Sequence, residues 1–257
     1  MKNNSLGVLV IATGNYVKFI EPLFTSILKN CSQIDRISFH VFTDQTNLDF
    51  KDDYKVKFHY WPHSEWPNPT LLRYHAFSKY IKEIDFYQNL IYLDVDMSVR
   101  SDLLKIQSKE LFAVLHPGYK NKERKPFDNN KISTSYLVPE SRFHYVCGGV
   151  QGGSSESYLS AVSQMKSWIE SDLDNGIIAR WHDESYWNKY VNQHMSKSLI
   201  LGREYCWPEQ WVTTKNPGKI IALMKDHAAT RNNFSLKSKV RFLLSEVRMK
   251  LLRPRSY

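Results

Sequence analysis

The chain lacks any apolar run that approaches the roughly 20 residues a transmembrane helix needs. It also lacks a charged and then apolar opening of the secretory kind, because residues 1–5 lead directly into a strand-like segment. Its three cysteines are odd in number and widely spaced, which argues against a disulfide framework and favours a reducing compartment. These absences predict a cytoplasmic protein without a membrane span.

Internal repeats, low-complexity segments and a recognisable linker are absent too. The 257 residues therefore fit one large domain, or two closely joined halves, with a sizeable core. Acidic residues are in the minority, so the formal charge is +9. That charge favours an anionic partner without choosing among a nucleotide-sugar, a nucleic acid and a membrane. Aromatic residues reach 14%, which suits stacking on bases or sugar rings as well as core packing.

Strand-like and helix-like segments alternate along the chain. This order predicts an α/β sheet whose site lies at the carboxyl ends of the strands. The expected strands cover residues 6–12, 37–43, 91–97, 111–115 and 145–150, and the expected helices cover residues 20–28, 69–84, 154–169 and 181–194.

The most informative segment is 89–97 (NLIYLDVDM), a short β-favouring run that ends in two aspartates. Side chains two residues apart on a strand share a face, so Asp94 and Asp96 are expected to project together. Two convergent carboxylates suit Mn²⁺ or Mg²⁺, which typically neutralises the pyrophosphate of a nucleotide substrate. An aspartate pair that only caps a loop is the alternative, and other segments must decide between the two.

Further segments carry candidate site residues. Residues 116–118 (HPG) form a turn that presents a histidine. Residues 147–153 (CGGVQGG) lack side chains at four of seven positions, which permits close approach to a ligand or, equally, a bulge or tight bend. Residues 181–185 (WHDES) combine an aromatic ring, an imidazole and two carboxylates, as sugar sites do and as acid-rich helix starts also do. Lys225 and Arg231 bracket a loop suited to phosphate contacts.

Six motifs in this order carry a family resemblance over residues 6–233: HVFTDQ (40–45), DVDM (94–97), LHPG (115–118), GGS (152–154), WHDES (181–185) and NKY (188–190). Together they resemble glycosyltransferase family 6, the retaining α-1,3-galactosyl- and N-acetylgalactosaminyltransferases that include the blood-group A and B enzymes. The resemblance implies a GT-A fold, in which a Rossmann-like nucleotide-sugar-binding sheet and an acceptor-binding half surround one cleft.

The resemblance also implies residue roles. Glu184 matches the catalytic glutamate, which acts either as a covalent nucleophile or as the stabiliser of an oxocarbenium ion in front-face transfer. Asp94 and Asp96 match the pair that holds Mn²⁺, or Mg²⁺, against the diphosphate. The implied donor-binding set is Ile11, Ala12, Thr13, Tyr16, Arg73, Asp94, Val95, Asp96, Gly148, Gly149, Asp183, Lys225 and Arg231, and the implied acceptor-binding set is His116, Trp181, His182 and Glu184.

Substrate choice follows from the same resemblance. Gly118 and Gly149 align with two positions that separate the A-type from the B-type enzyme, and glycine leaves room for an N-acetyl group. UDP-GalNAc is therefore expected as donor, with a galactoside, fucosylated in the family, as acceptor. A UDP-galactose-dependent transferase and a non-catalytic glycan-binding protein of the same fold are the alternatives. Pro208 stands where mammalian members carry an aspartate that contacts the acceptor.

The resemblance predicts a GT-A domain over residues 1–233. Residues 234–257 lie past the core of the family, and their apolar stripe and excess of basic residues predict a basic amphipathic tail. Such a tail either lies on an anionic membrane, bringing the enzyme to lipid-linked acceptors, or packs on the domain or in a dimer. No recognised motif supports nucleic acid as a partner. Because the Golgi anchor and stem of mammalian members are missing, we expect a bacterial-type, cytoplasmic enzyme of surface-glycan or lipopolysaccharide biosynthesis, peripheral on the inner face of the membrane.

Overall fold

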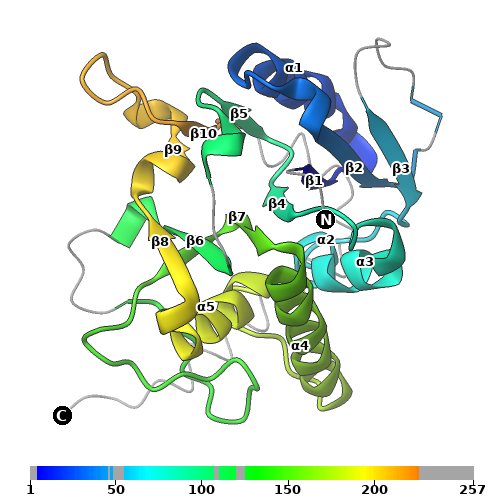
Figure 1. Cartoon of the computed structure of the whole chain (residues 1–257). Helices are drawn as coiled ribbons and strands as arrows, with labels where there is room; N and C mark the ends of the chain where they lie inside the picture. Colours follow the sequence, from blue (N-terminus) through cyan, green and yellow to red (C-terminus); the bar gives the residue numbers. More distant parts are fainter. Residues whose placement is uncertain (1–4, 46, 49–54, 107–109, 120–124, 226–257) are drawn as a thin grey trace. The chain divides into compact units, whose positions relative to one another are not determined.

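The computed structural model describes residues 5–45, 47–48, 55–106, 110–119 and 125–225. Its main feature is a seven-stranded sheet with the order β3-β2-β1-β4-β7-β6-β8 (Figure 1). The first four of these strands run parallel, whereas β7 runs antiparallel to both of its neighbours. The strands of this sheet are β1 (Leu6–Ile11), β2 (Ile37–Thr43), β3 (Val56–Tyr60), β4 (Asn89–Leu93), β6 (Leu111–Leu115), β7 (Val146–Ser154) and β8 (Ser198–Leu201).

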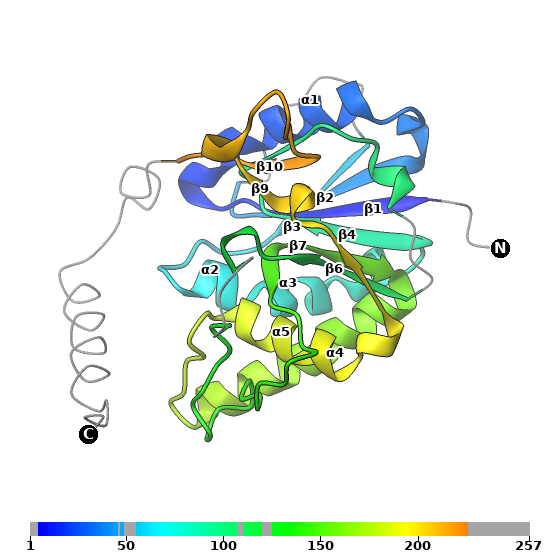
Figure 2. The ribbon, with the colours of Figure 1, turned by 90° about the vertical axis from the view of Figure 1, so that its left-hand side faces the viewer.

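Helices cover both faces of the sheet. Figure 2 shows α1 and the smaller sheet on one side and α2 to α5 on the other. The smaller sheet has the order β5-β10-β9. These elements are α1 (Ile20–Asn30), α2 (Asn68–Leu71), α3 (Arg73–Lys79), α4 (Ser155–Asp174), α5 (Asp183–Gln193), β5 (Met97–Val99), β9 (Trp207–Pro208) and β10 (Ile220–Ala222).

The apolar run of β1 explains the three-layer arrangement. Val8 and Val10 belong to the hydrophobic cluster that includes the buried face of α1. Leu9 and Ile11 belong to a second cluster, built with α3, α4 and α5. Alternate side chains of a strand point to opposite faces, so a strand with helices on both sides must be apolar throughout. The predicted α/β class is confirmed.

The segment with the two aspartates differs from its prediction. The strand predicted over residues 91–97 ends at Leu93, residues 94–96 form the connection, and Met97 begins β5 in the other sheet. Asp94 and Asp96 therefore lie in a turn between two sheets rather than on one strand. The chain must leave the main sheet here because β5 pairs with β10, not with a neighbour of β4.

The helix predicted over residues 69–84 is also wrong as one continuous element. It is divided into α2, α3 and a 3₁₀ turn at Ile81–Glu83. The first break lies at Leu72, whose φ of −96° and ψ of 15° depart from helical values. Buried Arg73 follows directly as the first residue of α3. The predicted strands 37–43 and 111–115 have the observed bounds, and helix 154–169 extends to Asp174 as α4.

Two strands of the main sheet were not predicted from the sequence. β3 and β8 occupy the two edges of the main sheet, and both were missed by the sequence prediction.

Among the described residues no helix is long and apolar enough to cross a membrane. Arg231 and the tail over residues 234–257 lie outside the described residues.

Candidate active site

Acidic side chains meet where strands of the main sheet end and where α5 begins. Asp94 follows the carboxyl end of β4, and Asp183 and Glu184 open α5. Gly148 of β7 lies between them: a Cβ atom added there would stand 3.2 Å from Asp183 Oδ2 and 3.2 Å from Glu184 Cβ. A side chain at this point would be in tight contact with both residues, and one of them would have to shift by a few tenths of an ångström.

Glu184 is held by two hydrogen bonds. The Tyr145 hydroxyl donates to Oε1 at 2.6 Å, and the Gly148 backbone N–H donates to Oε2 at 2.8 Å. Burial raises the pKa of Glu184, while the bonds from Tyr145 and Gly148 oppose that shift. The half-buried carboxylate is therefore fixed in orientation, which suits a nucleophile or an electrostatic stabiliser.

Two asparagines fix the helix that carries Glu184. Asn188 Oδ1 accepts the N–H of Val146 at 2.8 Å, and its Nδ2 donates to the carbonyl of the same residue at 2.8 Å. One turn later, Asn192 makes the same pair of bonds with His144. Side chains four residues apart share a helix face, so both amides lie on the same side of α5. They hold this side of the helix against the backbone of His144 and Val146. This docking sets the position of Glu184.

Arg73 is the buried cation of the site, with 3% of its surface exposed. Its Nε lies 3.1 Å from Asp183 Oδ2 and its Nη2 lies 3.4 Å from Asp94 Oδ1. Nη1 donates to the Gly148 carbonyl at 2.7 Å, and the guanidinium stacks over the Tyr92 ring at 4.3 Å. Burial opposes its charge, but Asp183, Tyr92 and Asp94 raise the pKa of Arg73 well above its ordinary value. One guanidinium thus joins both acidic segments.

Asp183 carries an oxygen that lacks a hydrogen bond. Although Oδ2 forms the ion pair with Arg73, it accepts no hydrogen bond from any residue that the structure describes. Burial raises the pKa of Asp183 to about 7, with Arg73 opposing the shift. A buried carboxylate oxygen without a donor is costly, and a ligand hydroxyl would satisfy it.

Asp94 and Asp96 fit a divalent cation. Tyr92 and Arg73 both engage Oδ1 of Asp94. Asp96 is 8% exposed, and burial followed by the charge of Asp94 raises its pKa; an ion pair with Lys225 offsets part of this. A buried carboxylate next to a partly exposed one, with its charge only partly compensated, suits a hard cation such as Mn²⁺ or Mg²⁺. No group of three or more His, Cys, Asp or Glu ligands occurs in the described part of the chain, so further ligands would come from substrate or water.

The predicted nucleotide-binding residues lie at the carboxyl end of β1. Ile11 ends the strand, Ala12 and Thr13 follow, and Tyr16 lies in the 3₁₀ segment Gly14–Phe19. The Tyr16 ring lies 5.1 Å from the Lys225 ammonium, which pairs with Asp96. This contact brings the β1 end to the aspartate pair.

Val95 lies between the two aspartates but has a different environment. Its side chain is 3% exposed and belongs to the hydrophobic cluster on the α1 side of the sheet. Any contact of Val95 with a donor would therefore involve its backbone rather than its side chain.

The predicted acceptor-side residues are less closely gathered. The His116 ring packs against that of Tyr145, the residue that donates to Glu184, in a tilted arrangement with centroids 5.6 Å apart. Trp181 is 40% exposed and donates through Nε1 to the Pro126 carbonyl. His182, immediately before α5, has φ 51° and ψ −129°, a strained backbone for a residue other than glycine. Such strain, two residues before Glu184, is typical of functional sites.

Sequence reasoning missed four functional neighbours: Tyr92, Tyr145, Gln151 and Asn188. Tyr92 could have been identified from the sequence, because it precedes Asp94 by two residues. Tyr145 and Asn188 contact the site through the packing of α5 against the start of β7, and Gln151 does so through the bulge of β7, which no sequence spacing shows.

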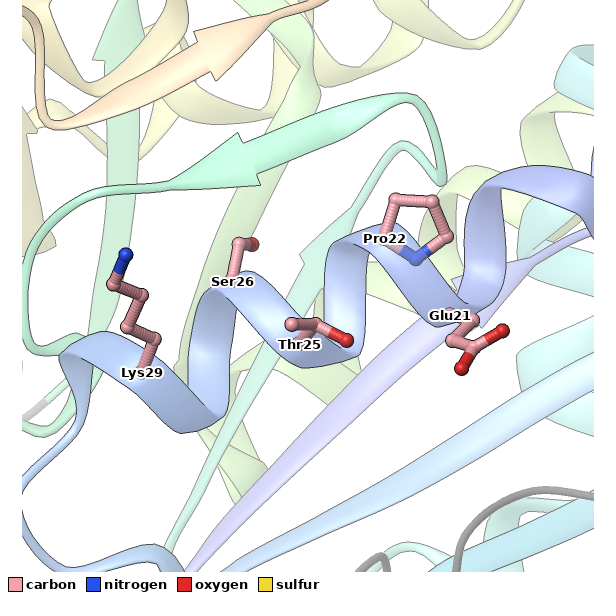
Figure 3. A pocket seen from close by; sticks show the side chains of 5 residues that line it. All are labelled: Glu21, Pro22, Thr25, Ser26 and Lys29. Atoms are coloured by element: carbon pink, nitrogen blue, oxygen red, sulfur yellow. The ribbon is translucent and has the colours of Figure 1, made fainter.

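A separate hollow lies along α1. Figure 3 shows its lining side chains, which all come from this one helix: Glu21, Pro22, Thr25, Ser26 and Lys29. Its volume is about 450 Å³, and none of the site carboxylates lines it. This hollow does not belong to the candidate active site.

A mixed α/β sheet that gathers carboxylates at its strand ends is characteristic of GT-A-type enzymes that transfer sugars from nucleotides. The profile of Glycosyltransferase family 6 matches residues 1–233. The chain belongs to this family and is a glycosyltransferase.

Relatives of known function agree with this assignment. The chain is 27% identical over 232 residues to the O-antigen biosynthesis glycosyltransferase WbnI of Escherichia coli, which covers 89% of this chain and 98% of that protein. It is 26% identical over 247 residues to histo-blood group ABO system transferase 2 of Rattus norvegicus, covering 90% and 73%. Human globoside alpha-1,3-N-acetylgalactosaminyltransferase 1 is 27% identical over 224 residues, covering 81% and 62%.

Proposed function

We propose that this enzyme transfers N-acetylgalactosamine from UDP-GalNAc to a galactoside of a surface glycan, forming an α-1,3 linkage with retention of configuration. The observation that supports this proposal is a set of contacts between acidic residues and two partners. Asp94 and Asp183 pair with Arg73, and Glu184 accepts a hydrogen bond from Gly148, whose carbonyl binds Arg73. Membership in glycosyltransferase family 6 supports a nucleotide-sugar donor and a glycan acceptor.

Glu184 is the proposed catalytic residue. Its two hydrogen bonds fix the carboxylate, and its partial burial strengthens its electrostatic effect on the reacting sugar. As positive charge develops at the anomeric carbon, this carboxylate stabilises it, by forming a covalent bond or by charge alone. The unsatisfied Asp183 oxygen supplies an acceptor for a hydroxyl of the donor sugar.

Enzymes of this family generally depend on a divalent metal. Here Asp94 and Asp96 would hold it, with Mn²⁺ as the proposed ion and Mg²⁺ as the alternative. The metal, when bound, neutralises the diphosphate of the donor and its leaving group. Lys225 reaches the same carboxylate pair, and it is proposed to contact the diphosphate together with Arg231.

The acceptor is proposed to enter beside His116, Trp181 and His182. A lipid-linked glycan reached from the cytoplasmic face of the membrane would suit the basic tail over residues 234–257. Sedimentation of the full-length chain with anionic lipid vesicles tests this peripheral contact. The relative WbnI acts in O-antigen biosynthesis, which supports a surface glycan as the product.

The test is turnover of UDP-GalNAc and UDP-galactose on a fucosyl-α-1,2-galactoside, with Mn²⁺ and with EDTA. We expect transfer of GalNAc that EDTA abolishes and Mn²⁺ restores. Preferential transfer of galactose would establish the alternative donor, and donor hydrolysis without transfer would contradict the acceptor. UDP binding without turnover in any condition would contradict the enzymatic proposal in favour of a glycan-binding protein.

The space around Gly149 determines what a substitution there would do to donor use. A Cβ atom at this position would stand 2.7 Å from Asp94 Oδ2 and 2.8 Å from Met97 Cε, distances that force a neighbour to move. Because the methyl group would displace a proposed metal ligand, Gly149→Ala is expected to lower kcat/KM with both donors by about 10-fold or more. Kinetics with each donor over a Mn²⁺ titration measure this effect.

Gly118→Ala is the comparison for the effect of Gly149→Ala on the proposed metal ligand. A Cβ atom at position 118 meets only the His116 ring, at 3.2 Å, and leaves Asp94 undisturbed. If Gly149→Ala changes the GalNAc-to-galactose ratio while Mn²⁺ affinity stays constant, the position acts on the sugar rather than on Asp94.

A further inference from the structure

The pairing of β7 with β6 is interrupted beside Gly148. Ala113 of β6 pairs with Gln151, yet Leu115, only two residues later, pairs with Val146. Four residues of β7 therefore stand opposite one residue of β6. In such a bulge the regular ladder is lost on one side, and buried backbone groups need other partners.

Side chains serve both backbone groups of Gly148. Its N–H donates to Glu184 Oε2, as described above. Its carbonyl accepts from Arg73 Nη1 at 2.7 Å and from Gln151 Nε2 at 2.9 Å. These groups belong to the two peptide units that meet at the Gly148 Cα, so the bonds to the carbonyl help to fix the residue whose N–H holds Glu184.

Gln151 is itself fixed by two tyrosines. It is fully buried, and its Oε1 accepts the Tyr74 hydroxyl at 3.1 Å and the Tyr158 hydroxyl at 3.3 Å. Since hydroxyls donate to the amide oxygen, the amide nitrogen must face the Gly148 carbonyl. The side chain thus bonds back three residues along its own strand and closes the bulge.

We propose that Gln151 is a positioning residue for Glu184. By closing the β7 bulge it holds Gly148 in place, through the carbonyl of that residue, so that the Gly148 N–H is directed at Glu184 Oε2. The catalytic importance of Glu184 rests on the proposed function, whereas the positioning itself rests on the hydrogen bonds alone.

If Gln151 had only a structural role, a different effect of its substitution would be expected. Its amide would then only satisfy polar groups within the core, and its loss would lower stability without a specific effect on the chemical step. The two roles are separated by kcat, by the KM for donor and by the geometry of Glu184.

The test is Gln151→Met, which keeps an unbranched side chain of similar length but donates and accepts no amide hydrogen bond. We expect kcat to fall by about 10- to 100-fold, because small misplacements of catalytic groups have effects of this size. The KM for the UDP-sugar is expected to stay unchanged, since Arg73 keeps its contacts with Asp94 and Asp183. Tyr74→Phe, which removes one of the two bonds to Oε1, is expected to give an intermediate loss of kcat.

Ser155→Ala is the matched control, because Ser155 is buried and its hydroxyl bonds only to the Tyr87 carbonyl, at 2.6 Å. It is expected to lower stability and leave kcat unchanged. A crystal structure of Gln151→Met gives a readout that needs no activity: the bond from Gly148 N to Glu184 Oε2 should be lost or lengthened. An unchanged 2.8 Å bond, or a loss of kcat matched by Ser155→Ala, would overturn the positioning role. Absence of turnover in the unsubstituted enzyme would instead contradict the proposed function.

Discussion

Glu184→Gln is expected to reduce kcat by about 10²- to 10³-fold or more, the effect of removing a preorganised electrostatic group from an active site. The amide has nearly the same shape but no negative charge, so it cannot stabilise a cationic sugar or attack it. Tyr145 can still donate to its oxygen, and the fold is expected to remain intact. Single-turnover kinetics with UDP-GalNAc, and thermal unfolding of both proteins, measure the two effects separately.

Glu170→Gln is the control for this variant. Glu170 lies on α4, is 46% exposed as a side chain and pairs with Lys166 at the surface, so kcat should not change. If Glu184→Gln retains wild-type kcat, Glu184 is not the catalytic residue. Nearby Asp183 would then become the candidate, since its carboxylate lies in the same buried site.

Arg73→Met is expected to lower the free energy of unfolding by about 3–5 kcal/mol, the cost of removing one partner from a buried ion pair. Asp183, 3% exposed, would lose its only cation among the ion pairs of the described residues, and the Gly148 carbonyl would lose its charged donor. Activity should be lost in parallel, because the same guanidinium orients Asp94. Urea unfolding gives the stability, and donor turnover gives the activity.

Arg73→Lys and Arg142→Met keep this prediction interpretable. Lysine retains the charge but cannot reach Asp94, Asp183 and the Gly148 carbonyl at once, so it should recover stability more than activity. Arg142 is 71% exposed and pairs only with Glu140 among the ion pairs described, so its loss should change stability by less than about 1 kcal/mol. Equal stabilities of Arg73→Met and Arg142→Met would contradict the role of Arg73 as the central buried cation.

The sequence was most informative where one pattern had one physical cause. The uninterrupted apolar run of β1 predicted a strand buried on both faces, and its two clusters confirm this. Asp183 and Glu184 were expected at the start of a helix, where acids are favoured, and α5 begins at Asp183. Such local preferences act within a few residues, so they are visible in the sequence.

Prediction failed where long-range pairing overrode local preference. The apolar run that continues through Val95 to Met97 looked like one strand, but it is shared between two sheets because β5 finds its partner in β10. The glycine-rich segment 147–153 was equally consistent with a ligand loop and a bulge. It is a bulged strand, and only its pairing with β4 and β6 decided this.

The sequence by itself determined the fold class, the family resemblance and the identity of the residues that carry charge in the site. It did so because buried strands, helix starts and paired aspartates each depend on neighbours in the chain. Only the tertiary structure decided that Arg73 joins Asp94 to Asp183 and that the Gly148 peptide holds Glu184. These contacts join residues 21 to 110 positions apart in the chain, and packing of the sheet against α3 and α5, rather than local spacing, brings them together.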